Sequence, residues 1–250
     1  MSKFFVKPEQ IKESDIIIVG DDVNHIVNVL RMKSGDEIQI CNQENGDNYK
    51  AEIVNYSKTA VECKIIEKIE KTTESNVNIT LFQGIPKFEK MELIIQKNTE
   101  IGVKKIVPVI MERTVVKLDE KIVNKKLERW QKIAEVAAKQ SMRDVIPKIE
   151  NIVKIKEIDV PRFDAVLIAY ENEDHNMLKT ELKKFRALKE KKDLQYNIAI
   201  VIGPEGGIAE KEIETLIEKG AVCVSLGKRI LRTETAGLVM AGNILYELEI

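Results

Sequence analysis

Residues 198–207 read Ile198-Ala199-Ile200-Val201-Ile202-Gly203-Pro204-Glu205-Gly206-Gly207. The first five are apolar without interruption, which is typical of a strand buried on both faces of a parallel sheet. The glycines that follow favour a tight turn, because glycine tolerates positive φ and lets a ligand approach the backbone. Residues 209–219 then have helical apolar spacing. This order predicts an α/β domain with a ligand site at the loop. An ordinary tight turn is the alternative interpretation.

Apolar strands alternate with amphipathic helices on both sides of this loop. This alternation predicts a parallel sheet with helices on both faces and ligands at the carboxyl ends of its strands. The predicted strands are 78–82, 105–109, 165–169, 198–202 and 222–226, and the predicted helices are 88–101, 124–140, 175–191, 209–219 and 233–248.

The first 70 residues have a different pattern, with short strands joined by tight turns. Strands are predicted at 4–6, 37–41, 49–54 and 60–66, with turns at 34–36 and 44–47 and one helix at 23–31. This pattern predicts a small β-barrel type of domain. The polar residues 71–76 then predict a linker, so the 250 residues divide into two domains near Lys71.

Composition excludes several classes of protein. The hydrophobic fraction of 44% is sufficient for a packed core, and the longest apolar run, residues 165–170, is too short to cross a membrane. The N-terminus has no signal-peptide pattern, so we expect a cytoplasmic protein. Three separated cysteines and two histidines provide neither a zinc spacing nor a disulfide framework, so no metal is predicted.

The formal net charge of −1 argues against a protein that coats nucleic acid without specificity. However, residues 84–148 carry 15 basic and 9 acidic side chains. This block suggests one positively charged face. A solvated, lysine-rich helix surface would explain the charge equally well.

A second loop, residues 225–236, also follows a predicted strand and opens a helix. Thr233 is a suitable helix cap, and Glu234 in the first turn complements the helix dipole. Arg232 lies at the mouth of the predicted site. The alternatives are a purely capping Glu234 and a surface Arg232 paired with Glu234 or Glu205. Small residues in the last helix predict close packing against another helix, of the same chain or of a second copy.

The chain lacks the usual signatures of nucleophilic and metal catalysis, such as GxSxG, HExxH or a paired cysteine and histidine. The dinucleotide pattern GxGxxG and the P-loop GxxxxGK[ST] are also absent. An enzyme of this kind fits group transfer from a reactive cofactor, with the protein supplying orientation and electrostatics.

The two loops together resemble those of the SPOUT class of methyltransferases, and among them the RsmE family, which methylates N3 of a uridine in 16S ribosomal RNA. The resemblance covers essentially the whole chain in the right order. It extends over residues 25–31, 35–36, 83–87, 91–97, 99–103, 112–115, 129–141, 202–207 and 225–236.

This resemblance implies a PUA-like β-barrel in residues 1–71 and a SPOUT domain in residues 72–250, with a trefoil knot at about 165–250. It also implies a homodimer with the site near the subunit interface, and S-adenosylmethionine as cofactor. The residues that would hold the cofactor are Ala169, Tyr170, Glu171, Ile202, Gly203, Gly206, Gly207, Leu226, Gly227, Ile230, Leu231, Thr233, Thr235 and Ala236.

The resemblance also suggests roles in the reaction. Arg232 would stabilise negative charge on the uracil or hold a phosphate, and Glu205 or Glu234 would polarise the N–H or hold Arg232. The residues expected to contact 16S rRNA, free or in the small ribosomal subunit, are Lys3, His25, Arg31, Lys87, Lys97, Arg113 and Arg143.

Three positions depart from the family pattern. Lys3 replaces an arginine, Met142 stands where a glycine is common, and Ala209 replaces a Ser or Thr helix cap. Other readings of the same residues are a methyltransferase acting on ribose 2′-oxygens and a non-catalytic RNA-binding factor with this fold. A nucleotide-dependent oxidoreductase has the least support, because both nucleotide fingerprints are absent.

Overall fold

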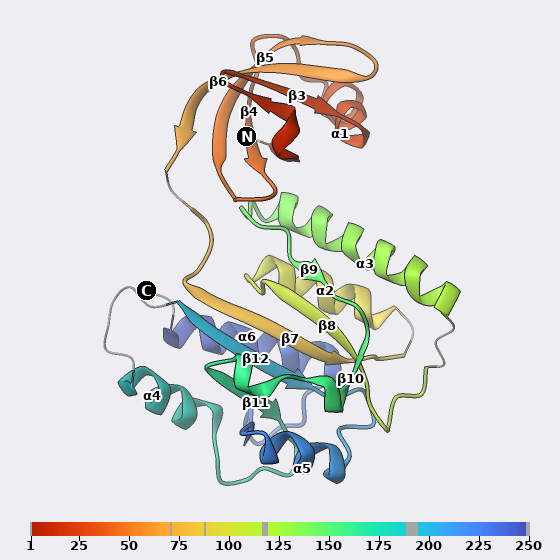
Figure 1. Cartoon of the computed structure of the whole chain (residues 1–250), viewed down its shortest axis with the longest axis vertical. Coiled ribbons are helices and arrows are strands. Elements are labelled where there is room, and N and C mark those ends of the chain that lie inside the picture. The colour runs from red at the N-terminus through yellow and green to blue at the C-terminus, as the bar shows by residue number, and fades with distance from the viewer. Residues whose placement is uncertain (1, 71, 88, 117–119, 189–194, 249–250) are drawn as a thin grey trace. The chain divides into compact units, whose positions relative to one another are not determined.

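The computed structural model describes residues 2–70, 72–87, 89–116, 120–188 and 195–248 (Figure 1). The chain forms two compact units. The first comprises Met1–Glu74 and Ala138–Ile146, and the second comprises Ser75–Ala137 and Pro147–Ile250. The domain boundary near residue 71 stays a prediction; residues 138–146, which it places in the second domain, belong to the first compact unit.

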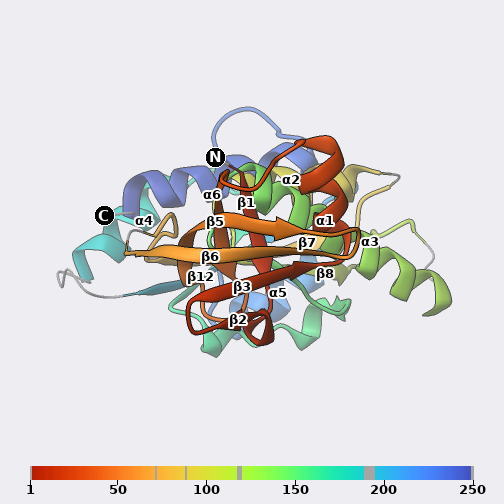
Figure 2. The same cartoon turned by 90° about the horizontal axis from the view of Figure 1, so that it is seen from above.

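The first unit is built on a six-stranded sheet in the order β1-β4-β5-β6-β3-β2. Figure 2 shows β3, β5 and β6 side by side. The β1–β4 pair is parallel and the other pairs are antiparallel. The strands are β1 (Lys3–Val6), β2 (Ile11–Lys12), β3 (Asp15–Val19), β4 (Glu37–Asn42), β5 (Asn48–Tyr56) and β6 (Ala60–Ile69).

Sequence reasoning identified four of these six strands and missed β2 and β3. The helix predicted at 23–31 begins and ends two residues earlier, and consists of α1 (Asp21–Asn24) followed by the π-helix His25–Val29. The core of the sheet contains Ile16, Ile18 and Ile38 together with Val23 and Ile26 of the helical segment. Packing on this core explains the helix, because a segment this short is not stable alone.

A buried polar cluster in the first unit surrounds Asp144. Its carboxylate accepts hydrogen bonds from Lys3 Nζ, from Thr72 Oγ1 at 2.7 Å and from the Thr73 amide at 2.7 Å. Arg143 forms a second buried ion pair, 2.6 Å from Glu74. Each of these charges is compensated inside the protein, which burial requires.

Burial by itself would raise the pKa of Asp144, but the hydrogen bonds from Lys3, Thr72 and Thr73 outweigh it and lower that pKa. We expect Lys3→Met to destabilise the protein by about 3 kcal/mol at pH 7, because it leaves a buried carboxylate without its cation. A depressed pKa contributes stability above its unfolded value, and this contribution is lost as pH falls through the folded value. The difference between the wild type and Lys3→Met should therefore shrink near pH 3.

Urea unfolding at both pH values measures this difference. Lys50→Met is the matched control, because Lys50 forms an exposed pair with Glu37 in the same unit. We expect this control to lose less than about 1 kcal/mol. An equal loss for the two variants would contradict a special contribution from Asp144.

Met142 adopts a left-handed backbone conformation, with φ +60°. This explains the glycine that is common at this position, because a residue with a Cβ is strained there. Its carbonyl accepts hydrogen bonds from Lys3 Nζ at 3.3 Å and Thr73 Oγ1 at 3.2 Å, which fix the conformation. We expect Met142→Gly to raise the free energy of unfolding by about 1 kcal/mol. A lower melting temperature by calorimetry would be evidence against relief of strain.

The second unit contains a seven-stranded sheet in the order β10-β8-β7-β12-β11-β13, with β9 also paired to β8. Every pairing in it is parallel. The strands are β7 (Val77–Gly84), β8 (Lys105–Ile110), β9 (Lys148–Ile149), β10 (Val153–Lys154), β11 (Ala165–Ala169), β12 (Tyr196–Ile202) and β13 (Val222–Val224). The predicted parallel α/β sheet is confirmed, and β12 lies between β7 and β11.

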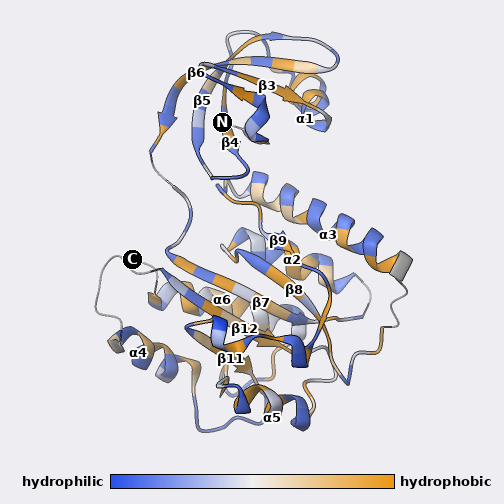
Figure 3. Ribbon diagram, viewed as in Figure 1, coloured by the Kyte–Doolittle hydropathy of each residue, from blue (hydrophilic) through white to orange (hydrophobic). Residues whose placement is uncertain are grey.

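Helices cover this sheet on both faces. α6 (Thr233–Leu248) packs on β7, β12 and α2 (Lys90–Glu100), while α5 (Glu210–Glu218) packs over the opposite face. The remaining helices are α3 (Glu120–Gln140) and α4 (Leu178–Leu188). Blue and orange alternate along α3 in Figure 3, as expected for an amphipathic helix. The predicted start of the helix 88–101 and the predicted end of the helix 175–191 lie outside the described residues.

The packing of α6 on β7 and α2 explains Gly237 in the last helix, whereas a Cβ added to Gly242 would have no atom within 4 Å. A Cβ added to Gly237 would lie 3.5 Å from Leu81 Cδ1 and 3.7 Å from Asn98 Nδ2. The close helix contact predicted from sequence is therefore made within the same chain. The trefoil knot implied for residues 165–250 stays a prediction. In the described part of the chain, no helix has the length and apolar character needed to cross a membrane.

Candidate functional site

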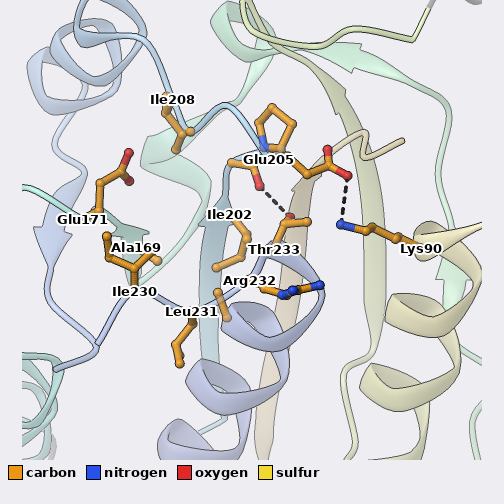
Figure 4. Close-up of a pocket in the computed structure, with 14 residues that line it drawn as sticks. Lys90, Ala169, Glu171, Ile202, Glu205, Ile208, Ile230, Leu231, Arg232 and Thr233 are labelled. Atoms are coloured by element: carbon orange, nitrogen blue, oxygen red, sulfur yellow. Dashed lines mark hydrogen bonds and ion pairs between the residues drawn. The ribbon is translucent and has the colours of Figure 1, made fainter. Parts of the chain in front are cut away.

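A cavity of about 400 Å³ opens at the carboxyl ends of β11 and β12, beside the start of α6 (Figure 4). This volume is within the range of small-molecule sites, roughly 300–1,000 Å³. Its lining residues are Lys90, Ala169, Glu171, Ile202, Gly203, Pro204, Glu205, Gly207, Ile208, Ile230, Leu231, Arg232, Thr233 and Ala236. The two loops singled out in the sequence therefore meet at one cavity.

The 203–207 loop forms one wall with its backbone. Gly207 has φ +73°, and its amide donates to the Pro204 carbonyl at 2.9 Å. A Cβ on Gly207 would lie 2.6 Å from Glu171 Oε1, and a Cβ on Gly203 would lie 2.9 Å from the Gly207 carbonyl carbon. Close approach of the backbone therefore requires glycine at position 203, whereas the positive φ favours glycine at position 207, because the Glu171 carboxylate could move aside.

Gly206 has different surroundings from its neighbours. Its carbonyl accepts a hydrogen bond from Arg113 Nη1 at 3.0 Å, and an added Cβ would lie 3.0 Å from Arg113 Cβ. Gly206 and Thr235 do not line this cavity. Their cofactor contact stays a prediction, and the geometry assigns Gly206 to the support of Arg113.

Thr233 connects three elements at the floor of the site. Its hydroxyl donates to the Gly203 carbonyl at 2.7 Å and accepts from Gln83 Nε2 at 2.9 Å. These bonds join the ends of β7 and β12 to the first residue of α6. The capping role predicted for Thr233 is replaced by this link between the loops. Gln83, which is fully buried, was missed as a site residue.

A second cavity of about 150 Å³ adjoins the first and shares Ala169, Glu171, Ile230, Leu231 and Ala236 with it. Tyr170, Leu226 and Gly227 line this second cavity, and their contact with the cofactor stays a prediction. Gly227 has φ +116° with no atom within 4 Å of an added Cβ, so its backbone is accessible.

The chemistry of these walls fits S-adenosylmethionine. Ile202, Ile208, Ile230 and Leu231 provide an apolar surface for an adenine ring. The Glu171 carboxylate lies at both cavities and is suited to accept hydrogen bonds from ribose hydroxyls or an ammonium group. The backbone of the 203–207 loop, where a Cβ added to Gly203 would clash, also lets a cofactor approach closely.

Charged side chains gather at the opposite side of the cavity from Glu171, as Figure 4 shows. Lys90 Nζ lies 3.1 Å from Glu205 Oε1 and 3.4 Å from Glu234 Oε2. Glu205 also accepts the Lys87 amide at 3.1 Å. Burial acts to raise the pKa of Glu205, but hydrogen bonds from backbone amides and Lys90 outweigh it and lower that pKa.

Arg232 lies at the mouth of the same cavity with an 82% exposed side chain. Its Nη1 is 4.0 Å from Glu234 Oε1, at the limit of an ion pair. The guanidinium is therefore accessible to a ligand. The alternative of a tightly paired surface arginine has little support from this distance.

Sequence reasoning missed Lys90, although a signal was present. Lys90 is the first residue of α2, where a positive charge opposes the helix dipole. A cation in this position is stabilised by acidic partners elsewhere in the fold. Glu205 and Glu234 are those partners, and they lie more than 100 residues away in the chain.

The predicted RNA-binding residues have three kinds of environment. Lys87 and Arg113 are exposed beside the 203–207 loop, while Lys97 pairs with Glu100 at 2.8 Å on α2. His25 and Arg31 are exposed in the first unit. These five stay predictions.

The structure argues against the RNA contacts predicted for Lys3 and Arg143. Only 3% of Lys3 and 4% of Arg143 are exposed, and both are held in the buried ion pairs with Asp144 and Glu74. A phosphate cannot reach either cation without breaking these pairs, so we assign both a structural role. Their side-chain type suggested RNA contact, but their burial depends on the tertiary structure.

Comparison with protein families identifies both parts of the chain. Residues 18–66 match the RNA methyltransferase PUA domain, and residues 73–245 match the RNA methyltransferase domain. The sequence is 39% identical over 255 residues to ribosomal RNA small subunit methyltransferase E of Bacillus subtilis, covering 100% of this chain and 98% of that protein. Identity to the protein of the same name from Mesomycoplasma hyopneumoniae is 35%, covering 96% and 97%.

Solved structures agree with these relatives. Ribosomal RNA small subunit methyltransferase E of Neisseria gonorrhoeae, bound to S-adenosyl methionine, has a TM-score of 0.83 and 31% identity, covering 100% of this chain and 98% of that one. A Legionella pneumophila protein in complex with the bound cofactor SAM has a TM-score of 0.81 and 29% identity, covering 98% and 96%.

The fold, the cavity and these matches define an RNA methyltransferase with an N-terminal PUA domain. The class predicted from the two loops is thereby confirmed. More particularly, the chain belongs to the ribosomal RNA small subunit methyltransferase E (RsmE) family.

Proposed function

We propose that this protein transfers a methyl group from S-adenosylmethionine to N3 of one uridine of 16S ribosomal RNA, in the cytoplasm. The observation that carries the proposal is the cavity where the 203–207 loop and the 230–236 segment meet, with an accessible Arg232 at its mouth. Family membership supports the choice of small-subunit rRNA as the substrate.

Different residues of the site bind the cofactor and the uracil. The backbone of the 203–207 loop and the side chains of Ile230 and Leu231 hold the adenine, while Glu171 accepts hydrogen bonds from polar groups of the cofactor. The bound cofactor supplies an electrophilic methyl group on a sulfonium. Arg232 binds the uracil as N3 loses its proton, or the phosphate beside it.

Selectivity for RNA is assigned to the exposed cations. Lys87 and Arg113 flank the loop of the cavity, and His25 and Arg31 belong to the PUA-like unit. Contacts of this kind with phosphates position an RNA and make its binding depend on salt.

We also propose that the protein acts as a homodimer. Tyr246 near the end of α6 is 90% exposed and Ile230 beside the cavity is 86% exposed. Large apolar side chains so exposed favour a partner surface. Analytical ultracentrifugation tests this directly, and a monomer at micromolar concentration would contradict it.

The function is tested with labelled cofactor, small subunits that lack the modification, and naked 16S rRNA. We expect label in 3-methyluridine at a single position, identified by mass spectrometry of nucleosides and mapped by fragment analysis. Label in a 2′-O-methylated nucleoside would show that the protein methylates the ribose and not the base. Cofactor binding without transfer to either RNA would favour a non-catalytic factor.

A further inference from the structure

Lys90 lies between the two carboxylates of the site and contacts both. Its Nζ is 3.1 Å from Glu205 Oε1 and 3.4 Å from Glu234 Oε2, and its side chain is 30% exposed. Figure 4 shows it reaching across from α2 to Glu205 beside Arg232. Lys90 therefore joins the 203–207 loop to the first turn of α6.

Neither carboxylate is well placed to remove the uracil proton. Glu205 accepts the Lys87 amide through both oxygens, at 3.1 and 3.2 Å, and Lys90 through one of them. A carboxylate whose pKa is held below its usual range is a weak base. Glu234 lies between Lys90 and Arg232, with a side chain only 14% exposed.

The reaction itself creates negative charge at this place. The N3–H proton leaves to solvent, the N3 electron pair forms the bond to the methyl carbon, and the carbon–sulfur electrons remain on sulfur. Two uncompensated carboxylates nearby would oppose the loss of that proton, because like charges disfavour a second anion. One ammonium between them removes much of this opposition.

The charges near Lys90 come from several elements. Besides Glu205 and Glu234, the charged side chains on the surrounding elements are Lys87 and Glu89 before α2, Arg232 before α6, Arg113 and, across the cavity, Glu171. Among the cations in the described part of the chain, Lys90 forms ion pairs with both carboxylates, at 3.1 and 3.4 Å. The pKa of Lys90 is raised, chiefly by its hydrogen bond to Glu205, so it stays charged at neutral pH.

We propose that Lys90 is a positioning residue of the methyl-transfer site: it neutralises Glu205 and Glu234, so that bound uracil can lose its N3 proton near neutral pH. Through Glu234 it also leaves Arg232 free for the uracil anion. This inference rests on the proposed uridine-N3 methylation.

The test compares Lys90→Met and Lys90→Arg with the wild type under saturating cofactor and RNA. We expect Lys90→Met to raise the apparent pKa of the kcat–pH profile by about one unit, because a nearby charge is removed from a partly exposed site. The value of kcat at pH 7 should fall about tenfold and recover to within about threefold at high pH. Lys90→Arg should stay within about threefold of the wild type at both pH values.

Two further readouts separate positioning from a merely structural role. Calorimetric affinity for S-adenosylmethionine should change less than about threefold in Lys90→Met. The Glu205 carboxyl, titrated by carbon NMR without cofactor, should show a raised pKa in that variant. The matched control is Lys184→Met, which removes a lysine 2.6 Å from Glu181 on α4 and should leave the profile unchanged.

An unchanged pH profile in Lys90→Met, with a normal melting temperature, would overturn the proposal. A uniform loss of kcat at every pH without rescue by Lys90→Arg would overturn it as well. Both outcomes presuppose a wild type that forms 3-methyluridine. A wild type that methylates another atom, or none, would instead overturn the proposed function.

Discussion

Arg232→Ala should reduce kcat for methyl transfer by about 10²–10³-fold while leaving the fold and the cofactor affinity unchanged. The guanidinium is 82% exposed and its one ion-pair distance is 4.0 Å, so its removal breaks no close contact in the described part of the chain. The role we propose for Arg232 is confined to the negative charge that develops on the uracil or to the phosphate next to it. The loss should therefore appear in kcat, with the melting temperature of the wild type.

Single-turnover kinetics with saturating RNA measure this loss, and calorimetry measures cofactor affinity in the same variant. Arg232→Lys should restore only part of the rate, because lysine retains the charge without the planar pair of donors. The matched control is Arg162→Ala, an exposed arginine of the same unit that lies outside the proposed site. Turnover by Arg232→Ala within about threefold of the wild type would remove Arg232 from the mechanism.

Gly203→Ala should weaken S-adenosylmethionine binding by about 100-fold. The added Cβ would lie 2.9 Å from the Gly207 carbonyl carbon and 2.9 Å from Ile208 Cγ1. Because one of these neighbours is backbone, the loop has to move, and the same backbone forms the wall of the cavity. The Gly203 carbonyl also holds Thr233 at 2.7 Å, so the shift reaches the start of α6.

Isothermal calorimetry gives the cofactor affinity, and circular dichroism gives the melting temperature. The control is Gly35→Ala in the first unit, where φ is +93° and no atom lies within 4 Å of an added Cβ. This control introduces backbone strain of roughly 1 kcal/mol without touching the site. Equal cofactor affinities for Gly203→Ala and the wild type would contradict the position assigned to the loop.

Sequence alone determined the elements whose residues form a local pattern. The continuous apolar run of β11 (Ala165–Ala169) and the start and end of α6 (Thr233–Leu248) agree with the prediction to the residue. A strand buried on both faces is a continuous apolar run, and a helix buried along one side has apolar residues at helical spacing. Both patterns can be read directly in a short window of the sequence. The two loops that surround the cavity were also visible, because glycines and a helix start lie within them.

Other features depend on partners that are distant in the chain. The two-residue β2 is too short to give a local pattern and depends on its pairing with β3. The β-branched run Ile16–Val19 of β3 is a strand signal that was missed, and its pairing with β6 became visible only in the structure. From the sequence alone, Lys3 and Arg143 are expected to contact RNA. In the fold they form buried ion pairs with Asp144 and Glu74.

Lys90 shows the same limit at the site itself. In the sequence it is a lysine at an unfavourable end of a helix, and only the tertiary structure brings Glu205 and Glu234 to it. The sequence therefore indicated the class of protein through its resemblance to a known family, and it located the loops of the cavity because backbone conformation and periodicity are local. The tertiary structure decided which charges are buried, paired or free, because electrostatic interactions depend on distances in space that the order of residues does not contain.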